Sequence, residues 1–108
     1  EVLSPLCHGQ TAVYRPWQCR SGCFGPAVPV EPGPLTVVEG SYSLHPSLRD
    51  RYQLRVWVEA PWEVRRTRLE RRDPGCVDRF LNIWVPLEDH YFQACHVKDC
   101  CQIHCSGQ

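Results

Sequence analysis

The apolar run "LTVVE" at residues 35–39 constrains the fold more than any other stretch of this chain. The run is short and rich in β-branched residues, and it ends on Glu39 followed by Gly40. Successive side chains of a strand point to opposite faces of a sheet, so a run that is apolar at consecutive positions is typical of a strand covered on both faces. We therefore expect a buried strand that ends in a carboxylate.

Further elements follow this predicted strand. "LRVWVEA", residues 54–60, alternates apolar with polar or amphipathic side chains and predicts a second strand. Residues 61–75 predict a polar helix with Pro61 at its first helical position, and "DPG" at 73–75 breaks this helix. Helical spacing resumes over residues 76–95, where Pro86 predicts a kink or a restart, and "CCQIHC" at 100–105 predicts a last short strand. Strands that alternate with helices favour an α/β layer with a parallel sheet.

The first third of the chain has a different composition. Residues 1–8 predict the end of a helix that is closed by Gly9. Residues 14–34 contain five prolines and three glycines, which argues against long regular elements there. Three aromatic residues in this segment favour an ordered loop over a plain linker, namely Tyr14, Trp17 and Phe24.

The length and the net charge of the chain favour a single domain without a strong electrostatic attraction to nucleic acid or membranes. The 108 residues are enough for one modest domain, and the formal net charge of zero gives no global field that would attract nucleic acid or an anionic membrane. No apolar run approaches the roughly 20 residues that a membrane-spanning helix needs. The chain lacks methionine and opens on Glu1, so we expect a piece of a longer protein. No pattern in the sequence indicates an oligomeric state.

Eight cysteines allow two interpretations. A cysteine-rich, disulfide-stapled secreted binding module is one, since short secreted chains often use such frameworks. The cysteines are grouped rather than spread, and the apolar strands supply a core, which together favour reduced thiols in a cytoplasmic protein. A zinc site among the cysteines and histidines of residues 95–105 is disfavoured, because structural sites usually show C-x₂-C pairs and the chain has none.

Eleven of the twelve basic residues are arginines, and five of them lie in the predicted helix. On a helix Arg65, Arg68 and Arg72 share one face. Guanidinium groups match phosphate oxygens in a bidentate way, so this face suits a triphosphate. The alternative is a solvated helix in which Glu63 and Glu70 are salt-bridge partners of the arginines, and both interpretations stay open.

Glu39 is the candidate metal ligand. An acid at the end of a buried strand can hold Mg²⁺ directly or through water, as acidic residues do in P-loop proteins. The alternative is a strand that leaves the core into a turn. The spacing alone does not decide between them.

Three segments together carry a resemblance. "LTVVEGSYSLHPSLRDRYQLRVWVEAP", "RRTRLERR" and "RFLNIWVPLEDHYF" are similar to the carboxyl-terminal half of bacterial uridine-kinase-like P-loop phosphotransferases. The resemblance implies an α/β fold that is an incomplete part of a P-loop kinase-type parallel sheet with flanking helices. It also implies transfer of the γ-phosphoryl group of ATP to a nucleoside 5′-hydroxyl with Mg²⁺. The segments would be an acceptor-side loop at 14–34, two core strands at 35–60, a lid-like arginine helix at 61–75, and a carboxyl-terminal helix with a last strand at 76–108.

The resemblance also implies roles for single residues. Glu39 matches the acid of the second signature strand, on the Mg²⁺ side. The expected catalytic residues are Arg68 and Arg72 of the lid helix, with Arg65 beside the ATP phosphates. Trp17 falls near an aromatic that stacks on the base, and Tyr14 belongs to the same substrate loop. Two residues match a family motif to which we assign no role, Trp84 and Glu88.

The chain also departs from the family pattern. A phosphate loop needs G-x-x-x-x-G-K-[ST], yet the only lysine is Lys98, in "HVKDCC". The resemblance therefore implies that the phosphate loop, and the acid that accepts the hydroxyl proton, precede Glu1 in a longer protein. Gln18 stands where the family usually carries an acid after the stacking aromatic. We expect the chain alone to be inactive.

Overall fold

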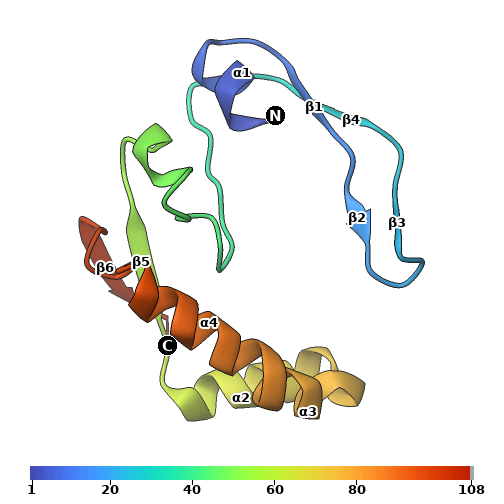
Figure 1. The fold of residues 1–108 in the computed structure, drawn as a ribbon, viewed down its shortest axis with the longest axis vertical. Coiled ribbons are helices and arrows are strands. Elements are labelled where there is room, and N and C mark those ends of the chain that lie inside the picture. Colours follow the sequence, from blue (N-terminus) through green and yellow to red (C-terminus); the bar gives the residue numbers. More distant parts are fainter. Residues whose placement is uncertain (108) are drawn as a thin grey trace. The chain divides into compact units, whose positions relative to one another are not determined.

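The computed structural model describes residues 1–107, and the chain divides into two compact units, Glu1–Glu39 and Gly40–Gln108. Figure 1 shows the helices and strands of both units. Within the described residues, no helix is both long enough and apolar enough to cross a membrane.

The first unit is a short helix followed by an antiparallel ribbon (Figure 1). Helix α1 (Leu3–Cys7) confirms the helix predicted over residues 1–8. The ribbon has two ladders, in which β1 pairs with β4 and β2 pairs with β3. Its strands are β1 (Ala12–Tyr14), β2 (Trp17–Gln18), β3 (Cys23–Phe24) and β4 (Val28–Val30). The predicted ordered loop is thus a ribbon whose strands are short, because prolines lack the N–H that a ladder needs.

The predicted strand over residues 35–39 is wrong. The segment has no strand structure, and Leu35 and Val37 are 78% and 77% exposed. The β propensity of such residues reflects packing in a sheet and is realised only when a neighbouring strand supplies hydrogen bonds. No described residue pairs with this segment, so the apolar run stays in an extended, exposed form.

The second unit contains a parallel pair of strands, β5 (Val56–Glu59) and β6 (Ile103–Ser106). The strands are in register from Val56 opposite Ile103 to Glu59 opposite Ser106. A parallel pair needs a long crossover connection, and here the connection is helical. It consists of α2 (Trp62–Arg72), a 3-10 turn (Pro74–Cys76), α3 (Val77–Arg79), a π-helical turn (Phe80–Trp84) and α4 (Val85–Ala94). A further 3-10 turn, Arg49–Arg51, precedes β5. The expected mixture of helices with a parallel sheet is confirmed at this coarse level.

The predicted helices are also present. Helix α2 occupies most of residues 61–75, and Pro61 is its N-cap, one residue before the first helical position. The kink or restart predicted at Pro86 takes the form of a change of helix type without a break, since the π-helical turn ends at Trp84 and α4 continues from Val85. Proline has no N–H to donate to the preceding turn, which accounts for a change of helical hydrogen bonding at this point.

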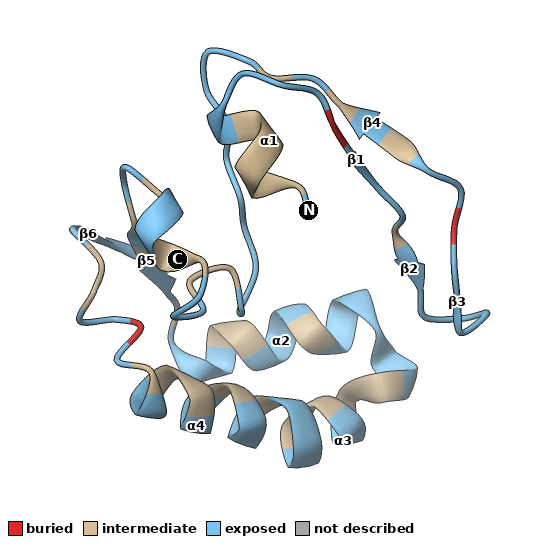
Figure 2. Cartoon of the chain, turned by 45° about the horizontal axis from the view of Figure 1, so that its top comes forward, coloured by how far each residue is buried: buried red, intermediate tan, exposed pale blue. Residues whose placement is uncertain are grey.

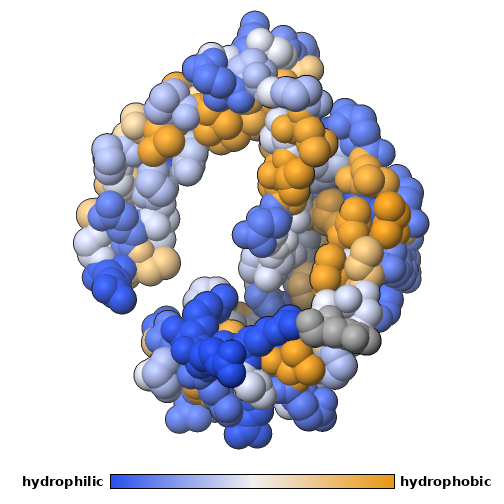
Figure 3. All heavy atoms as spheres, turned by 180° about the vertical axis from the view of Figure 1, so that it is seen from behind, coloured by the Kyte–Doolittle hydropathy of each residue, from blue (hydrophilic) through white to orange (hydrophobic). Residues whose placement is uncertain are grey.

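The core of the second unit lies where α4 meets β5. The rings of Trp57 on β5 and Phe92 on α4 meet edge to face with their centres 4.9 Å apart. Val97, just after α4, is 2% exposed. Figure 2 shows how few other positions are buried, and in Figure 3 apolar side chains reach the surface at several places. Much of the apolar surface of this chain therefore remains in contact with water.

An ion pair links the end of β5 to the loop after α4. Lys98 Nζ donates to Glu59 Oε2 at 2.7 Å, and Trp57 Nε1 donates to the same oxygen at 3.0 Å. These two hydrogen bonds lower the pKa of Glu59 below its ordinary value of 4.5, and the bond from Lys98 has the larger effect. A carboxyl group with a lowered pKa stabilises the fold above its ordinary pKa, and this contribution is lost as the pH falls through the lowered pKa.

We therefore expect Glu59→Gln to be less stable than the parent chain at pH 7 and equal to it in strong acid. Denaturant unfolding from pH 7 down to below the ordinary carboxyl pKa measures the difference. Lys98→Met removes the other partner and should give the same trend. A difference between Glu59→Gln and the parent that is constant with pH would contradict the role of this ion pair.

Candidate functional site

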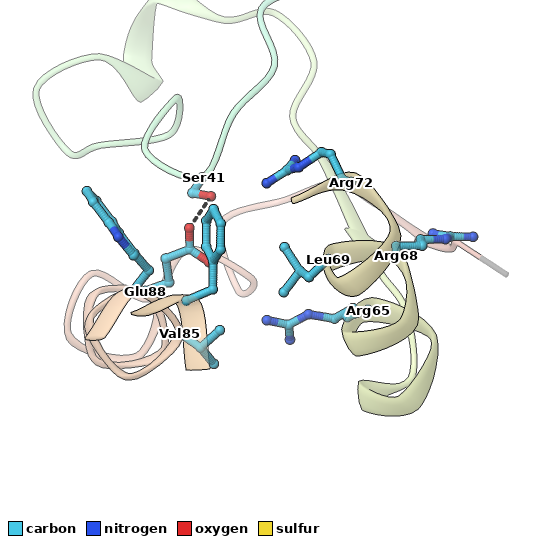
Figure 4. Close-up of a pocket in the computed structure, with 9 residues that line it drawn as sticks. Ser41, Arg65, Arg68, Leu69, Arg72, Val85 and Glu88 are labelled. Carbon is cyan, nitrogen blue, oxygen red and sulfur yellow. Dashed lines mark hydrogen bonds between the residues drawn. The ribbon is translucent and has the colours of Figure 1, made fainter. Parts of the chain in front are cut away.

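A groove runs between α2 and the helical segment formed by the π-helical turn and α4. Its volume is about 320 Å³. The lining residues are Ser41, Arg65, Arg68, Leu69, Arg72, Phe80, Trp84, Val85 and Glu88. Figure 4 shows it with α2 on one side and α4 on the other. All of these residues belong to the second unit, so the groove is complete within it.

The three arginines predicted to share a phosphate-binding face point in different directions. Figure 4 shows Arg65 and Arg72 extending from α2 toward the groove, whereas Arg68 extends to the opposite side of the helix. The Nη1 group of Arg68 donates to the carbonyl oxygen of Gly107 at 3.3 Å. The structure thus brings Arg65 and Arg72 together over the groove and directs the Arg68 guanidinium elsewhere.

Aromatic rings hold the two inward arginines in place. The guanidinium carbon of Arg72 lies 5.5 Å from the centre of the Phe80 ring, and that of Arg65 lies 5.6 Å from the centre of the Trp62 ring. Such cation–π contacts restrict long side chains at a modest energetic gain. Because a ring has no carboxylate oxygens, the donors of both guanidinium groups are not occupied by these contacts.

The acids of α2 do not neutralise these two arginines. Glu70 accepts a hydrogen bond from Arg66 Nε at 2.8 Å, on an exposed part of the helix. Glu88 is the carboxylate in the groove, opposite two inward guanidinium groups. The groove therefore carries a surplus of positive charge, and strongly hydrophilic side chains gather over α2 in the lower part of Figure 3. The alternative of a salt-bridged helix therefore holds for Arg66. It does not hold for Arg65 and Arg72, which can bind an anion.

A contact that the sequence did not predict closes one end of the groove. Ser41 Oγ donates to Glu88 Oε1 at 2.7 Å, as drawn in Figure 4. Nearby, the Tyr42 and Tyr91 rings have centres 4.7 Å apart, and His45 stacks parallel to Tyr91 at 6.3 Å. The two motifs "EGSYSLHP" and "WVPLEDHYF" are thus packed against each other. They are 47 residues apart at Ser41 and Glu88, so no local spacing could reveal this contact.

The predicted substrate residues Tyr14 and Trp17 belong to the ribbon of the first unit. Trp17 lies opposite Phe24 in the β2–β3 ladder, with ring centres 5.1 Å apart, and the Trp17 side chain is 55% exposed. Arg15 packs over the Phe24 ring at 5.9 Å and donates from Nε to the Gly25 carbonyl at 2.9 Å. The ribbon therefore presents an exposed aromatic face, which is the surface a planar base would need.

Glu39 is not where the sequence placed it. It is exposed and outside any strand, so the expected position at the carboxyl end of a buried strand is wrong. Among residues 1–107, no three or more histidine, cysteine or acidic side chains are grouped so as to hold a metal ion. A Mg²⁺ ion bound through Glu39 would therefore need further oxygen ligands from outside these residues, such as phosphates or water.

Two of the eight cysteines share one hydrogen-bond acceptor. Cys100 Sγ and Cys101 Sγ donate to the carbonyl oxygen of Val97 at 3.1 Å and 3.3 Å. Burial raises the pKa of the Cys101 thiol, the adjacent Cys100 raises it further, and the positive charge of Arg55 opposes both effects. None of the eight cysteines forms a disulfide in the described structure.

Neither models of known protein families nor curated protein sequences match this chain.

Proposed function

We propose that this chain is the lid- and acceptor-bearing part of a uridine-kinase-like P-loop phosphotransferase, which transfers the γ-phosphoryl group of ATP to a nucleoside 5′-hydroxyl. The single observation that carries this proposal is the groove in which Arg65 and Arg72 extend toward the same space (Figure 4). Arg65 and Arg72 are seven residues apart, which is about 10.5 Å along the helix axis. Two guanidinium forks that reach one groove from this spacing suit the two ends of a short polyphosphate chain.

The size and charge of the groove support an anionic ligand. Its volume of about 320 Å³ lies at the lower end of the range for small-molecule sites, roughly 300–1,000 Å³. Catalysis of phosphoryl transfer depends on positioning and on neutralising the charge of the phosphoryl oxygens, and arginines supply both. The geometry favours Arg65 and Arg72 for this role over Arg68, whose guanidinium already donates to Gly107.

Glu39 is proposed as a Mg²⁺ ligand of the longer enzyme. It is exposed and lies outside any strand in the described structure. The remaining oxygen ligands of the ion would come from the phosphates of ATP and from water.

The ribbon is proposed to hold the nucleoside. Trp17 and Phe24 form an exposed edge-to-face pair, and Tyr14 lies on the adjoining β1. Aromatic faces bind bases by stacking, which on its own tolerates any base. Gln18 follows Trp17 on β2, so its side chain points to the other face of the ribbon, and its Oε1 already accepts a hydrogen bond from Ser21 Oγ at 3.1 Å. The choice of base is therefore not assigned to Gln18.

Binding and turnover measured with the same 108-residue chain test the proposal. We expect no transfer of phosphate from ATP to uridine, because the chain lacks a phosphate-loop motif. We expect tripolyphosphate to bind, as measured by calorimetry, and uridine to quench tryptophan fluorescence in the parent chain but not in Trp17→Phe. A chain that binds neither ligand would contradict the proposed function, and uridine turnover would contradict the need for an additional phosphate loop.

A further inference from the structure

The loop between α4 and β6 places two thiols side by side on one acceptor. Cys100 and Cys101 are adjacent in the chain, and both sulfurs donate to the Val97 carbonyl oxygen, at 3.1 Å and 3.3 Å. Two sulfurs that share one acceptor atom lie on the same side of the backbone. This arrangement differs from an ordinary pair of neighbouring side chains, which would point in different directions.

The backbone around these thiols is held by several contacts. Val97, whose carbonyl is the shared acceptor, is 2% exposed. The amide of Cys100 donates to His96 O at 3.2 Å, and that of Cys101 donates to Lys98 O at 3.1 Å. The two sulfurs are therefore preorganised, which lowers the entropic cost of binding a ligand through both.

A disulfide is a poor use of this geometry. The Cα atoms of adjacent residues are about 3.8 Å apart, and ordinary disulfides need about 4.4–6.8 Å. A metal ion bound between the two sulfurs removes this restriction on the Cα–Cα distance, because an S–metal–S bridge is longer than an S–S bond. The pair is thus better suited to chelate a thiophilic ion than to oxidise.

A positive charge lies beside the pair. The guanidinium of Arg55 acts electrostatically on Cys101, and its Nε is buried without a hydrogen-bond partner among the described residues. A buried, unsatisfied donor usually has a ligand or solvent partner. A complex with net negative charge at the two sulfurs would provide a compensating charge for this group.

We propose that Cys100 and Cys101 form a two-coordinate site for a soft monovalent cation of the Cu(I) class. Each thiol releases one proton to solvent and forms one metal–sulfur bond, so that Cu⁺ and two thiols give a bis-thiolate of charge −1 and two protons. No electron is transferred. Arg55 compensates the negative charge of the complex.

The coordination number favours this class over other metals. Zinc takes four ligands in structural sites, and no group of three or more potential ligands is assembled within residues 1–107. Cu(I) is soft, prefers thiolates and is satisfied by two of them. This site does not depend on the proposed phosphotransferase function, because it shares no residue with the groove.

Alkylation of the unmodified chain tests the site without a variant. One equivalent of Cu(I) is added anaerobically to the reduced chain, which is then treated with iodoacetamide and mapped by peptide mass. We expect Cys100 and Cys101 to be protected and the other six cysteines to react. Protection of other cysteines first, or of none, would overturn the proposal.

Variants provide the second measurement, by competition with a chromogenic Cu(I) chelator. The affinity for the first equivalent of Cu(I) should fall on the order of 10²-fold or more in C100S and in C101S. A single remaining thiolate binds the ion without the chelate effect of two linked ligands. Cys19→Ser with Cys23→Ser is the matched control and should retain the parent affinity. Arg55→Gln should weaken binding about tenfold, as loss of an outer-shell partner does. Unchanged affinity in C100S and C101S would overturn the site.

Discussion

Tripolyphosphate should bind roughly 10- to 100-fold more weakly to the Arg65→Ala, Arg72→Ala double variant than to the parent chain. Hydrogen bonds to charged groups each contribute about 1.5–3 kcal/mol, and solvent in an open groove reduces their sum. Both guanidinium groups extend into the groove and have aromatic rings as neighbours (Figure 4). Calorimetry at low and at high salt measures the effect, and the parent affinity should fall as salt rises.

Arg66→Ala is the matched control for this experiment. Arg66 lies on the same helix and has the same charge, but its Nε donates to Glu70 on an exposed face outside the groove. Its loss should change the affinity by less than about threefold, because Arg66 does not line the groove and its exposed charge acts on the ligand only through screening solvent. A loss of binding free energy per arginine that is equal in the control and in the double variant would show that only the net charge of α2 matters, which would contradict the groove as the anion site.

Phe92→Ala should destabilise the second unit by about 2 kcal/mol, less than the roughly 3–5 kcal/mol of a fully buried ring, because Phe92 is half-buried. Phe92 joins α4 to β5 through its edge-to-face contact with Trp57, at 4.9 Å. Domains of this size have only about 5–15 kcal/mol of stability, so this loss is a large part of it. Denaturant unfolding followed by far-UV circular dichroism measures the change.

Two variants control this experiment. Phe92→Leu keeps most of the apolar volume and should recover at least half of the loss. Phe24→Ala removes the same side chain from the ribbon, where it is 57% exposed, and should leave the unfolding of the second unit unchanged. A Phe92→Ala variant as stable as its parent would mean that the contact between α4 and β5 does not hold the unit together.

The helices could be predicted because their signals are local. Pro61 before α2, "DPG" after it, and Pro86 near the start of α4 each act on the backbone within a few residues. The parallel pairing of β5 with β6 could also be inferred, since a strand, a helical connection and a second strand require a crossover. These parts of the fold depend on short-range rules.

The strand over residues 35–39 could not be predicted, because strand structure depends on a partner that the segment itself does not contain. The β-branched residues of this run express a preference for a covered sheet, and no described residue pairs with them. The predicted position of Glu39 is wrong for the same reason, since it depended on that strand. Helix formation needs no such partner, which is why the two kinds of prediction differed.

The candidate site also has features that could be predicted from the sequence and features that could not. The sequence by itself determined that α2 would carry a row of arginines at helical spacing and that the segment with Tyr14, Trp17 and Phe24 would be ordered. Only the tertiary structure decided that Arg65 and Arg72 face the groove, that Arg68 turns to Gly107, and that Ser41 meets Glu88. Periodicity specifies which side chains share a helix face, but the direction of a long, flexible guanidinium is set by the partners that the fold brings to it.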